Sequence, residues 1–212
     1  LTDISKHWAK TTIEWGVNNG MVKGYPDNTF RPNNPVTEAE FLTLLIRTYE
    51  GEKDSDDEHW AGGYYQVAVE KNFPTNGANS MEKRNNKIDR THVAEIIAGA
   101  SGVNYTGDHA IQYLLGKGLA KGKVEGKINI ENYKGGDLLT RAEAVQFIKN
   151  AKEKGLNELK QRPFEPSPIN ELPELPETYT WKGYELPATL ELDTRYADSV
   201  YEDKETGLSV LL

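Results

Sequence analysis

The feature that most restricts the fold of this chain is an internal repeat with a spacing of about 52 residues. The tripeptide His-Trp-Ala at 7–9 returns at 59–61, and a related pentapeptide stands at 36–40, 88–92 and 139–143. A period of this length indicates that one supersecondary unit has been copied along the chain. The first three quarters of the sequence therefore divide into three copies, at 1–52, 53–104 and 105–160.

Each copy is predicted to form a helix, a loop and a second helix. In the first copy, apolar residues recur at helical spacing over 8–18, and Gly20 stands where a left-handed residue would end the helix. Turn-forming residues fill 24–32, which excludes a helix there. The second helix is predicted to begin at Thr37, with Glu40 completing a capping box.

The same start of the second helix is predicted in the other two copies. Thr140 and Glu143 repeat the capping box in the third copy. The second copy has Asp89, a good N-cap residue, but carries His92 where the glutamate would stand.

A helix pair of this length buries too little apolar surface to fold alone, so we expect the three copies to share one core. The predicted fold is mainly α-helical, with the three second helices forming a central bundle in a pseudo-threefold arrangement. Such an arrangement leaves grooves between neighbouring copies. Three related grooves favour a ligand that is itself a repeating polymer, because several weak sites gain avidity along one chain.

The charge of the chain and its lack of cysteine exclude several classes of function. The net charge is −8, and 163–212 accounts for it, with 11 acidic residues against three basic ones. No cluster of Lys and Arg indicates a nucleic-acid surface. Zero cysteine excludes disulfides, cysteine-based zinc sites and thiol nucleophiles. The four histidines have no metal-binding spacing, so we expect neither a metal nor a cofactor.

The sequence contains no segment that we expect to cross a membrane, since no run of 18 apolar residues occurs. The sequence begins at Leu1, already within the pattern of the first copy, which suggests a processed or excised piece of a longer protein. Export of that protein is compatible with the absence of cysteine.

The residue after each predicted N-cap is a candidate for ligand binding, and these residues are Glu38, Arg90 and Arg141. A cation at this position interacts unfavourably with the helix dipole, so no local structural effect explains an arginine there. One interpretation is anion capture by the guanidinium together with free N–H groups of the first turn. The alternative is a solvated surface arginine. Glu38 argues against an equivalent anion site in the first copy.

Tryptophans and glycines at equivalent positions are the other candidates. Trp8 and Trp60 either pack in the core or expose a flat face for a sugar ring. The glycines are predicted to need positive φ, and the second copy has asparagines that tolerate the same conformation. These positions are Gly20, Gly24, Gly118 and Gly122, with Asn72 and Asn76 in the second copy.

The repeat resembles the S-layer homology repeat, present here as a triplet. The resemblance rests on the segments at 1–4, 7–9, 24–32 and 36–40 and on the Thr-Arg-Ala-Glu motif at 140–143. It implies non-covalent anchoring of an exported protein to a Gram-positive cell wall or S-layer. The ligand so implied is a secondary cell wall polysaccharide, often with pyruvylated amino sugars, whose carboxylate suits the anion interpretation.

The resemblance also implies which side chains bind the polysaccharide. Carried over by position, these residues are Asp3, Trp8, Gly24, Trp60, Arg90, Gly122 and Arg141. The sequence departs from the pattern at Glu38, at Asn76 in place of a loop glycine, and at Thr106 in place of the third tryptophan. No single copy has the whole set. Because each groove is built from two copies, we expect one or two functional grooves.

The chain changes character after the third copy. Prolines punctuate 161–177, which predicts an extended acidic linker. Aromatic and apolar residues in 178–212, with a turn at Thr206-Gly207, predict a small β element or the first strands of a further domain.

We therefore expect an extracellular, non-catalytic module that binds an anionic wall polysaccharide in grooves between copies. Two alternatives remain open at this point. A degenerate triplet would act as a scaffold for protein contacts or self-association. An acidic tail would also suit the anchor of a wall-active enzyme whose catalytic domain lies outside this chain.

Overall fold

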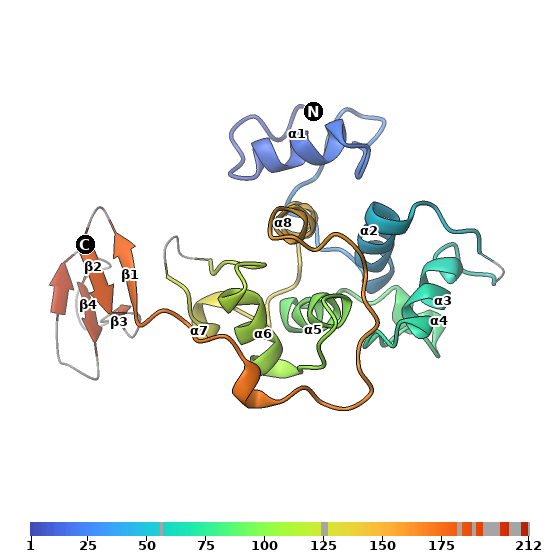
Figure 1. The fold of residues 1–212 in the computed structure, drawn as a ribbon. Helices are drawn as coiled ribbons and strands as arrows, with labels where there is room; N and C mark the ends of the chain where they lie inside the picture. Colours follow the sequence, from blue (N-terminus) through green and yellow to red (C-terminus); the bar gives the residue numbers. More distant parts are fainter. Residues whose placement is uncertain are drawn as a thin grey trace.

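The structure is a computed structural model, and it describes residues 1–55, 57–123, 127–181, 184–187, 190–192, 200–203 and 209–211. This part of the chain is mainly α-helical, as predicted, with eight α-helices (Figure 1). The long helices are α1 (Lys10–Asn18), α2 (Glu38–Glu50), α3 (Gly62–Glu70), α5 (Arg90–Ala100), α6 (Gly107–Gly116) and α8 (Arg141–Glu153). Two short helices, α4 (Met81–Arg84) and α7 (Ile130–Tyr133), lie in the loops of the second and third copies.

The second helix of each copy starts where the sequence predicts. Capping boxes join Thr37 to Glu40 and Thr140 to Glu143, and Asp89 accepts the His92 N–H at 2.8 Å. The first helices begin later than predicted, at Lys10 and Gly62. Trp8 and Trp60 therefore lie in the turns that precede α1 and α3.

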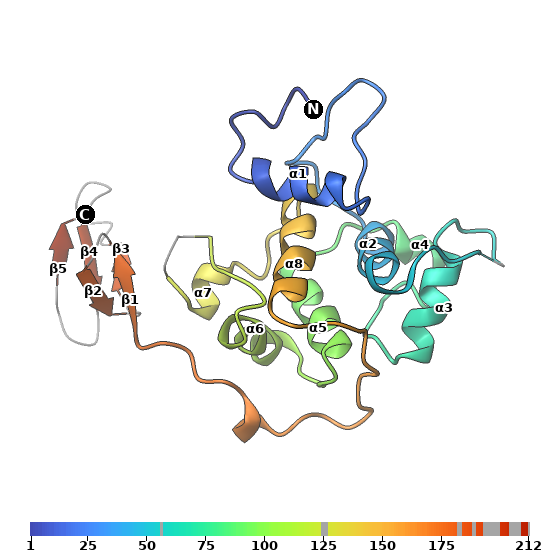
Figure 2. The same cartoon turned by 45° about the horizontal axis from the view of Figure 1, so that its top comes forward.

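The helices pair between copies rather than within them. Each second helix contacts the first helix of the next copy in a closed cycle, α2 with α3, α5 with α6 and α8 with α1. Thr12 of α1 donates a hydrogen bond to Gln146 of α8 at 2.6 Å, across the contact that closes the cycle. Figure 2 shows α1 lying against α8, although the two helices stand at opposite ends of the triplet sequence.

A cycle of backbone hydrogen bonds joins the segments that precede the three second helices. Val36 N–H donates to the carbonyl of Leu139 at 2.9 Å, Leu139 N–H to that of Ile88 at 2.9 Å, and Ile88 N–H to that of Val36 at 3.1 Å. All three side chains are buried. Each copy thus contributes one extended residue to a common centre, where its amide and carbonyl are both satisfied.

The three copies share one hydrophobic core, as predicted. Buried side chains from every copy form a single cluster, which includes Phe41, Leu45, Ile96, Ile97 and Ile148. Full burial of such a side chain stabilises the fold by about 1.5–3 kcal/mol. Because the core is shared, no copy is expected to hold its structure without the other two.

The proline-rich segment is extended as predicted, but it is docked on the helices rather than free. We call residues 159–173 the strap; it contains the short 3-10 helix η1 (Ile169–Glu171). Its Lys160 and Arg162 N–H groups donate to the carbonyls of Ala100 and Lys71, at 2.8 and 2.9 Å. Figures 1 and 2 show this segment running along the helices before it reaches the strands.

Asn104, between α5 and α6, is the main contact of the strap. Its side-chain amide donates to the carbonyls of Pro163 and Phe164, both at 3.1 Å, and its Oδ1 accepts from Arg162 at 2.6 Å. Asn104 is itself buried. The sequence predicts an extended segment because proline excludes helix there, but composition does not indicate what such a segment packs against.

The described residues of the tail form short antiparallel strands. Strand β1 (Thr178–Trp181) pairs with β2 (Tyr184–Pro187), and β3 (Leu190–Leu192), β4 (Val200–Asp203) and β5 (Ser209–Leu211) form a three-stranded sheet in that order. The predicted turn at Thr206-Gly207 lies outside the described residues. Within the described part of the chain, no helix has the length and apolar character needed to span a membrane.

The contacts of Asn104 predict a large effect of a single change on stability. Asn104→Ala removes three hydrogen bonds and leaves strap carbonyls and the Arg162 guanidinium with fewer partners, so the free energy of unfolding should fall by about 2 kcal/mol. Urea denaturation measures this. Asn18→Ala, at the exposed end of α1, is the control and should change stability by less than about 0.5 kcal/mol. Equal effects of the two changes would contradict a docked strap.

Candidate functional site

The residue that begins each second helix inserts into the loop of the next copy. The N–H of Glu38 donates to the carbonyl of Asn86 at 3.0 Å, that of Arg90 to Asp137 at 3.0 Å, and that of Arg141 to Asn34 at 2.9 Å. The first junction thus joins α2 to the second-copy loop, the second junction joins α5 to the third-copy loop, and the third junction joins α8 to the first-copy loop. The three candidate residues from the sequence occupy one equivalent position in this cycle.

At the third junction, Arg141 is held by backbone oxygens and aromatic rings. Its Nε donates to the Phe30 carbonyl at 2.9 Å and its Nη2 to the Lys23 carbonyl at 3.4 Å. The guanidinium lies 4.9 Å from the ring centre of Tyr25 and 4.7 Å from that of Phe30. Arg141 is only partly buried, and it makes no ion pair with any described residue. Its positive charge is therefore uncompensated in this part of the chain.

Asp3 shapes the loop that receives Arg141. Its two carboxylate oxygens accept the N–H groups of Phe30 at 2.8 Å and Arg31 at 2.7 Å. Desolvation raises the pKa of Asp3, but these two hydrogen bonds outweigh it and hold the pKa below its ordinary value. The Asp3 carboxylate is thus engaged by the loop backbone, and it orients the Phe30 peptide whose carbonyl accepts from Arg141.

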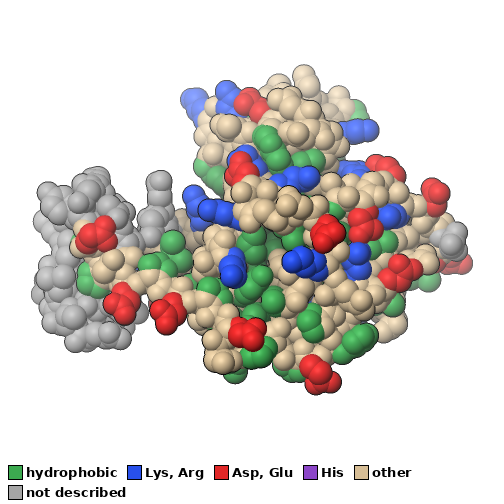
Figure 3. Space-filling model, in the orientation of Figure 1, with side chains coloured by type: hydrophobic (Ala, Val, Ile, Leu, Met, Phe, Trp, Pro, Cys, Tyr) green, Lys and Arg blue, Asp and Glu red, His purple; other side chains and the backbone are tan. Residues whose placement is uncertain are grey.

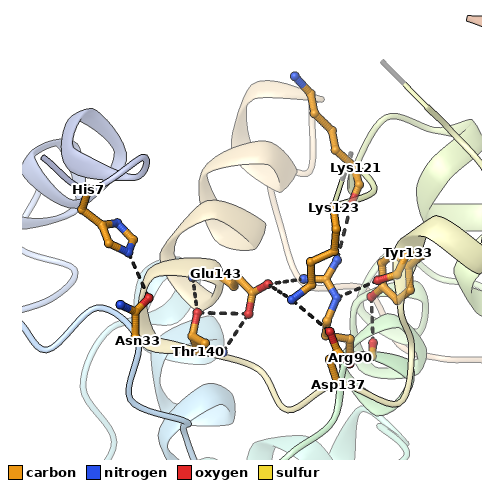
Figure 4. Close-up of polar contacts among 9 residues, drawn as sticks. All are labelled: His7, Asn33, Arg90, Lys121, Lys123, Tyr133, Asp137, Thr140 and Glu143. Carbon is orange, nitrogen blue, oxygen red and sulfur yellow. Dashed lines mark hydrogen bonds and ion pairs between the residues drawn. The ribbon is translucent and has the colours of Figure 1, made fainter. Parts of the chain in front are cut away.

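Both tryptophans are exposed, which excludes the core-packing interpretation. Trp8 is 65% exposed and Trp60 is 55% exposed. The adjacent His7 is fixed in one tautomer: Nδ1 accepts the Ala9 N–H at 3.1 Å, and Nε2 donates to Asn33 Oδ1 at 3.0 Å (Figure 4). Because Asn34 accepts the Arg141 N–H, this bond ties the turn that carries Trp8 to the third junction.

His59 repeats this arrangement beside Trp60. Its Nδ1 accepts the Ala61 N–H at 3.1 Å, and its Nε2 donates to Asn85 Oδ1 at 3.3 Å. Asn85 precedes Asn86, the carbonyl partner of Glu38. The exposed tryptophan of the second copy is therefore tied to the first junction.

The glycine predictions are only half correct. Gly20 and Gly118 have φ of 69° and 67°, and Asn72 has φ of 58°, as expected for left-handed C-caps. Gly24, Gly122 and Asn76 do not adopt positive φ, so the prediction was wrong for them. The two glycines are needed for close approach instead: a Cβ would lie 3.1 Å from the Thr29 carbonyl at Gly24 and 2.8 Å from that of Lys127 at Gly122.

The second junction neutralises its own arginine. Arg90 is 4% exposed, so the surface interpretation is wrong for it. Its Nη1 binds Glu143 Oε1 at 2.8 Å, and its Nε donates to the Tyr133 carbonyl at 2.9 Å (Figure 4). Lys123 also binds this carboxylate at 3.0 Å. The ion pair with Glu143, 53 positions away in the sequence, therefore explains an arginine at position 90 in structural terms.

The first junction has the opposite polarity. Glu38 is buried, and its carboxylate accepts from Tyr65 OH at 2.8 Å and from the N–H groups of Asn76 at 2.9 Å and Gly77 at 2.7 Å. His92 Nε2 lies 3.5 Å from the same carboxylate. An acid that already occupies these donors leaves no anion site, in line with the sequence argument about Glu38.

The structure brings together residues that sequence reasoning separated by copy. Asp3 and Gly24 of the first copy lie in the loop that receives Arg141 of the third, and Trp8 is linked to this junction through the hydrogen bond between His7 and Asn33. Trp60 lies at the first junction with Glu38, and Gly122 lies at the second with Arg90. Sequence reasoning missed Asn33, because no local pattern shows which loop receives which helix.

Comparison with known proteins shows what part of this arrangement is shared. Residues 1–42 match the model of the S-layer homology domain. The chain carries an S-layer homology domain at its N-terminus. Such a domain is a cell-surface anchoring module, and it places the chain at the cell surface, in the S-layer or cell wall. The matched residues include the whole loop side of the third junction, whereas Arg141 comes from outside the match.

Several relatives of the chain have names that refer to anchoring, the S-layer or the cell wall. It is 48% identical over 50 residues to a cellulosome-anchoring protein of Acetivibrio thermocellus, covering 24% of this chain and 11% of that protein. It is 28% identical over 160 residues to the S-layer protein sap of Bacillus anthracis, covering 67% and 20%. It is 30% identical over 100 residues to the middle cell wall protein of Brevibacillus brevis, covering 47% and 9%. The chain thus spans a fifth or less of each relative.

The surface around the S-layer homology domain carries mixed charge. Acidic and basic side chains are interspersed over the visible face, without a broad basic patch (Figure 3). Among the described residues, no group of three or more His, Asp or Glu side chains is placed to hold a metal ion. The uncompensated guanidinium of Arg141 is therefore the main chemical feature of the third junction.

The ion pair at the second junction predicts a pH-dependent contribution to stability. Burial raises the pKa of Glu143, but the Thr140 N–H and the charges of Arg90 and Lys123 outweigh it and hold the pKa below the ordinary 4.5. The pKa of Glu143 is lower in the folded chain than in the unfolded chain. The ionised carboxylate therefore stabilises the fold above about pH 4.5, and this stabilisation is lost as the pH falls through the pKa of the folded state.

Glu143→Gln should therefore lower the free energy of unfolding at pH 7 by about 3 kcal/mol, because it leaves Arg90 buried with less counter-charge. It should also flatten the decline of stability below pH 5. Urea denaturation at a series of pH values measures both effects. Glu14→Gln, which removes an exposed ion pair with Lys10 on α1, is the control. An unchanged pH profile in Glu143→Gln would refute the assignment.

Proposed function

We propose that this chain is a non-catalytic anchor that binds an anionic secondary polysaccharide of a Gram-positive cell wall at the third junction. The observation that carries the proposal is the guanidinium of Arg141, which is fixed by two carbonyls and has no acidic partner among the described residues. The cyclic contacts between copies support a pseudo-threefold triplet with the copy boundaries predicted from the sequence.

The geometry of Arg141 suits a carboxylate ligand. A guanidinium has five N–H donors, and the two carbonyl bonds leave the others available. A carboxylate accepts two parallel hydrogen bonds from such a group, which fixes both position and orientation. The pyruvate ketal of a pyruvylated amino sugar presents such a carboxylate, and the exposed ring of Trp8 offers an apolar face to the same polymer.

The other two junctions are poorer anion sites for distinct reasons. Arg90 already has Glu143 as its counter-charge, and displacing it would break a buried ion pair and leave that carboxylate with Lys123 as its one cationic partner among the described residues. Glu38 repels an anion and already holds the nearby N–H groups. We therefore assign anion binding to one groove, and the roles of Arg90, Trp60 and Gly122 in binding remain predictions that this geometry does not favour.

Arg141→Ala tests the proposal. It should weaken binding to purified Gram-positive wall sacculi by about 1–3 kcal/mol, the value of a charged hydrogen bond. It should not unfold the chain, since a cation in the first turn opposes the helix dipole. Lys152→Ala, which removes a charge from the last turn of the same helix, should bind like the unchanged chain. Co-sedimentation at several salt concentrations measures the difference.

Binding to stripped sacculi provides the second arm of this test. Chemical removal of the secondary polysaccharide should abolish co-sedimentation of the unchanged chain. Equal binding to intact and stripped walls, or equal loss in Arg141→Ala and Lys152→Ala, would contradict the proposed role of Arg141.

A further inference from the structure

The dipeptide Asn-Gly occurs twice in this chain, at Asn19-Gly20 and at Asn76-Gly77. Asparagine is a chemically labile residue. It is most labile before glycine, because glycine has no side chain to hinder the attack of its backbone nitrogen on the asparagine side chain. Both asparagines are exposed. The structure places the two dipeptides in opposite electrostatic surroundings, so their reactivity should differ.

The first dipeptide, Asn19-Gly20, borders a cavity of about 180 Å³ where three helices end. The last turn of α1 and the residues after it line this cavity, together with Arg47 in the last turn of α2 and Lys152 in the last turn of α8. None of the described lining residues is Asp or Glu. The cavity beside this dipeptide is therefore positively charged.

Neither cation of this cavity is fully neutralised. Arg47 Nη2 donates to the carbonyl of Met21, the residue after Gly20, at 2.5 Å. Arg47 also pairs with Glu52 at 3.5 Å, but the Glu52 side chain is 78% exposed, so solvent screens this pair. Lys152 Nζ lies 4.9 Å from the ring centre of Tyr49 and has no acidic partner among the described residues.

Positive charge promotes the loss of the side-chain amide, or deamidation, that asparagine undergoes before glycine. The Gly20 nitrogen gives its proton to water and attacks Cγ of Asn19. The new N–Cγ bond forms, the Cγ–Nδ2 bond breaks, and Nδ2 takes up a proton and leaves as ammonia. Water then opens the succinimide ring to aspartate or isoaspartate. Negative charge develops on the attacking nitrogen and on the side-chain oxygen, and a nearby cation stabilises it.

The backbone at Asn19 can reach the reactive geometry at low cost. Asn19 is the C-cap of α1, with ψ of 7°, and this bond must rotate before the Gly20 nitrogen reaches Cγ. The Gly20 N–H donates to the Val17 carbonyl at 3.0 Å, and Asn19 Nδ2 donates to the Trp15 carbonyl at 2.8 Å. Helix ends open with little cost in free energy, so both bonds are lost whenever the end of α1 frays.

The second dipeptide, Asn76-Gly77, is held by Glu38 of the first copy. The two carboxylate oxygens of Glu38 accept the N–H groups of Asn76 at 2.9 Å and Gly77 at 2.7 Å. Arg84 Nε donates to the Gly77 carbonyl at 2.9 Å, and the charge of Arg84 is paired with Asp57 at 2.7 Å. The Gly77 nitrogen must leave the Glu38 carboxylate before it can attack the asparagine side chain.

Glu38 opposes deamidation of Asn76 through its charge as well. A carboxylate is too weak a base to take the proton of a backbone amide, and it repels the negative charge that develops on a nitrogen 2.7 Å away. Glu38 is 2% exposed, so water screens this repulsion poorly. Reaction at Asn76 therefore requires the first junction to open, and its rate is limited by the fraction of chains in the open form.

We propose that Asn19 is a site of spontaneous deamidation in the folded chain and that Glu38 protects Asn76 from the same reaction. The first junction, which offers no anion site, thus has a function of its own. It preserves a labile dipeptide whose glycine is required by packing, because a Cβ at Gly77 would lie 2.6 Å from the Tyr65 hydroxyl. The proposal does not depend on polysaccharide binding.

Peptide mapping by mass spectrometry during incubation of the full chain at neutral pH tests the proposal. In the folded chain, Asn19 should deamidate faster than Asn76 by about ten-fold or more, because only the first dipeptide opens locally. In guanidinium chloride, the two rates should agree within about two-fold. Equal rates in the folded chain would overturn the proposal. A difference that persists in denaturant would also overturn it, because neighbouring residues and not the fold would then be the cause.

Charge variants test the cationic cavity. Lys152→Gln should slow the deamidation of Asn19 by about three-fold, the effect of one partly screened charge. Lys10→Gln, at the opposite end of α1, is the matched control and should leave the rate unchanged. Equal rates in the two variants would overturn the role of the cations.

The protective role of Glu38 is tested by Glu38→Gln. This change should speed the deamidation of Asn76 by about ten-fold, because glutamine offers one acceptor oxygen to two N–H groups. Glu14→Gln is the control, and circular dichroism shows whether each variant is folded. An unchanged rate at Asn76 in folded Glu38→Gln would overturn the protective role. If Glu38→Gln does not fold, the comparison of the unchanged chain with and without denaturant decides.

Discussion

The backbone hydrogen bonds among Val36, Ile88 and Leu139 are the constraint on which the rest of the structure depends. They bring one extended residue from each copy to a common centre, so the helix that follows in each copy must leave that centre toward the next copy. Each second helix consequently packs on a neighbour's first helix, and its first residue enters that neighbour's loop. The proposed anion site in this architecture therefore belongs to a junction between copies and not to a single copy.

One position in this cycle carries three different kinds of chemistry. Arg141 donates to loop carbonyls and keeps an uncompensated charge, Arg90 makes equivalent carbonyl contacts but is buried against Glu143, and Glu38 accepts from loop amides. The fold tolerates this variation because the position is anchored through its backbone N–H in every case. Its side chain is therefore available either for stability or for ligand recognition. Where a counter-charge lies next to the side chain, the side chain stabilises the fold. Where no counter-charge is present, the side chain can recognise a ligand.

Local signals in the sequence predicted the starts of the second helices, the mainly α-helical fold and the shared core, because capping boxes and apolar spacing act within a few residues. The exposure of Trp8 could not be predicted, since an aromatic side chain suits a core as well as a sugar face. The partner of Arg90 lies 53 residues away and the receptor loop of Arg141 lies over 100 residues away, beyond any local pattern. The docking of the strap was missed for the same reason, because proline content limits conformation without specifying contacts.

The central claim is that Arg141, and not Arg90, meets the anionic ligand. The most direct test follows the side-chain Nε–H NMR signals of both arginines while purified secondary wall polysaccharide is added to the full chain. The account predicts that the Arg141 signal shifts and saturates, while the Arg90 signal stays in place beside Glu143. A saturable shift of Arg90 with Arg141 unchanged would contradict the account.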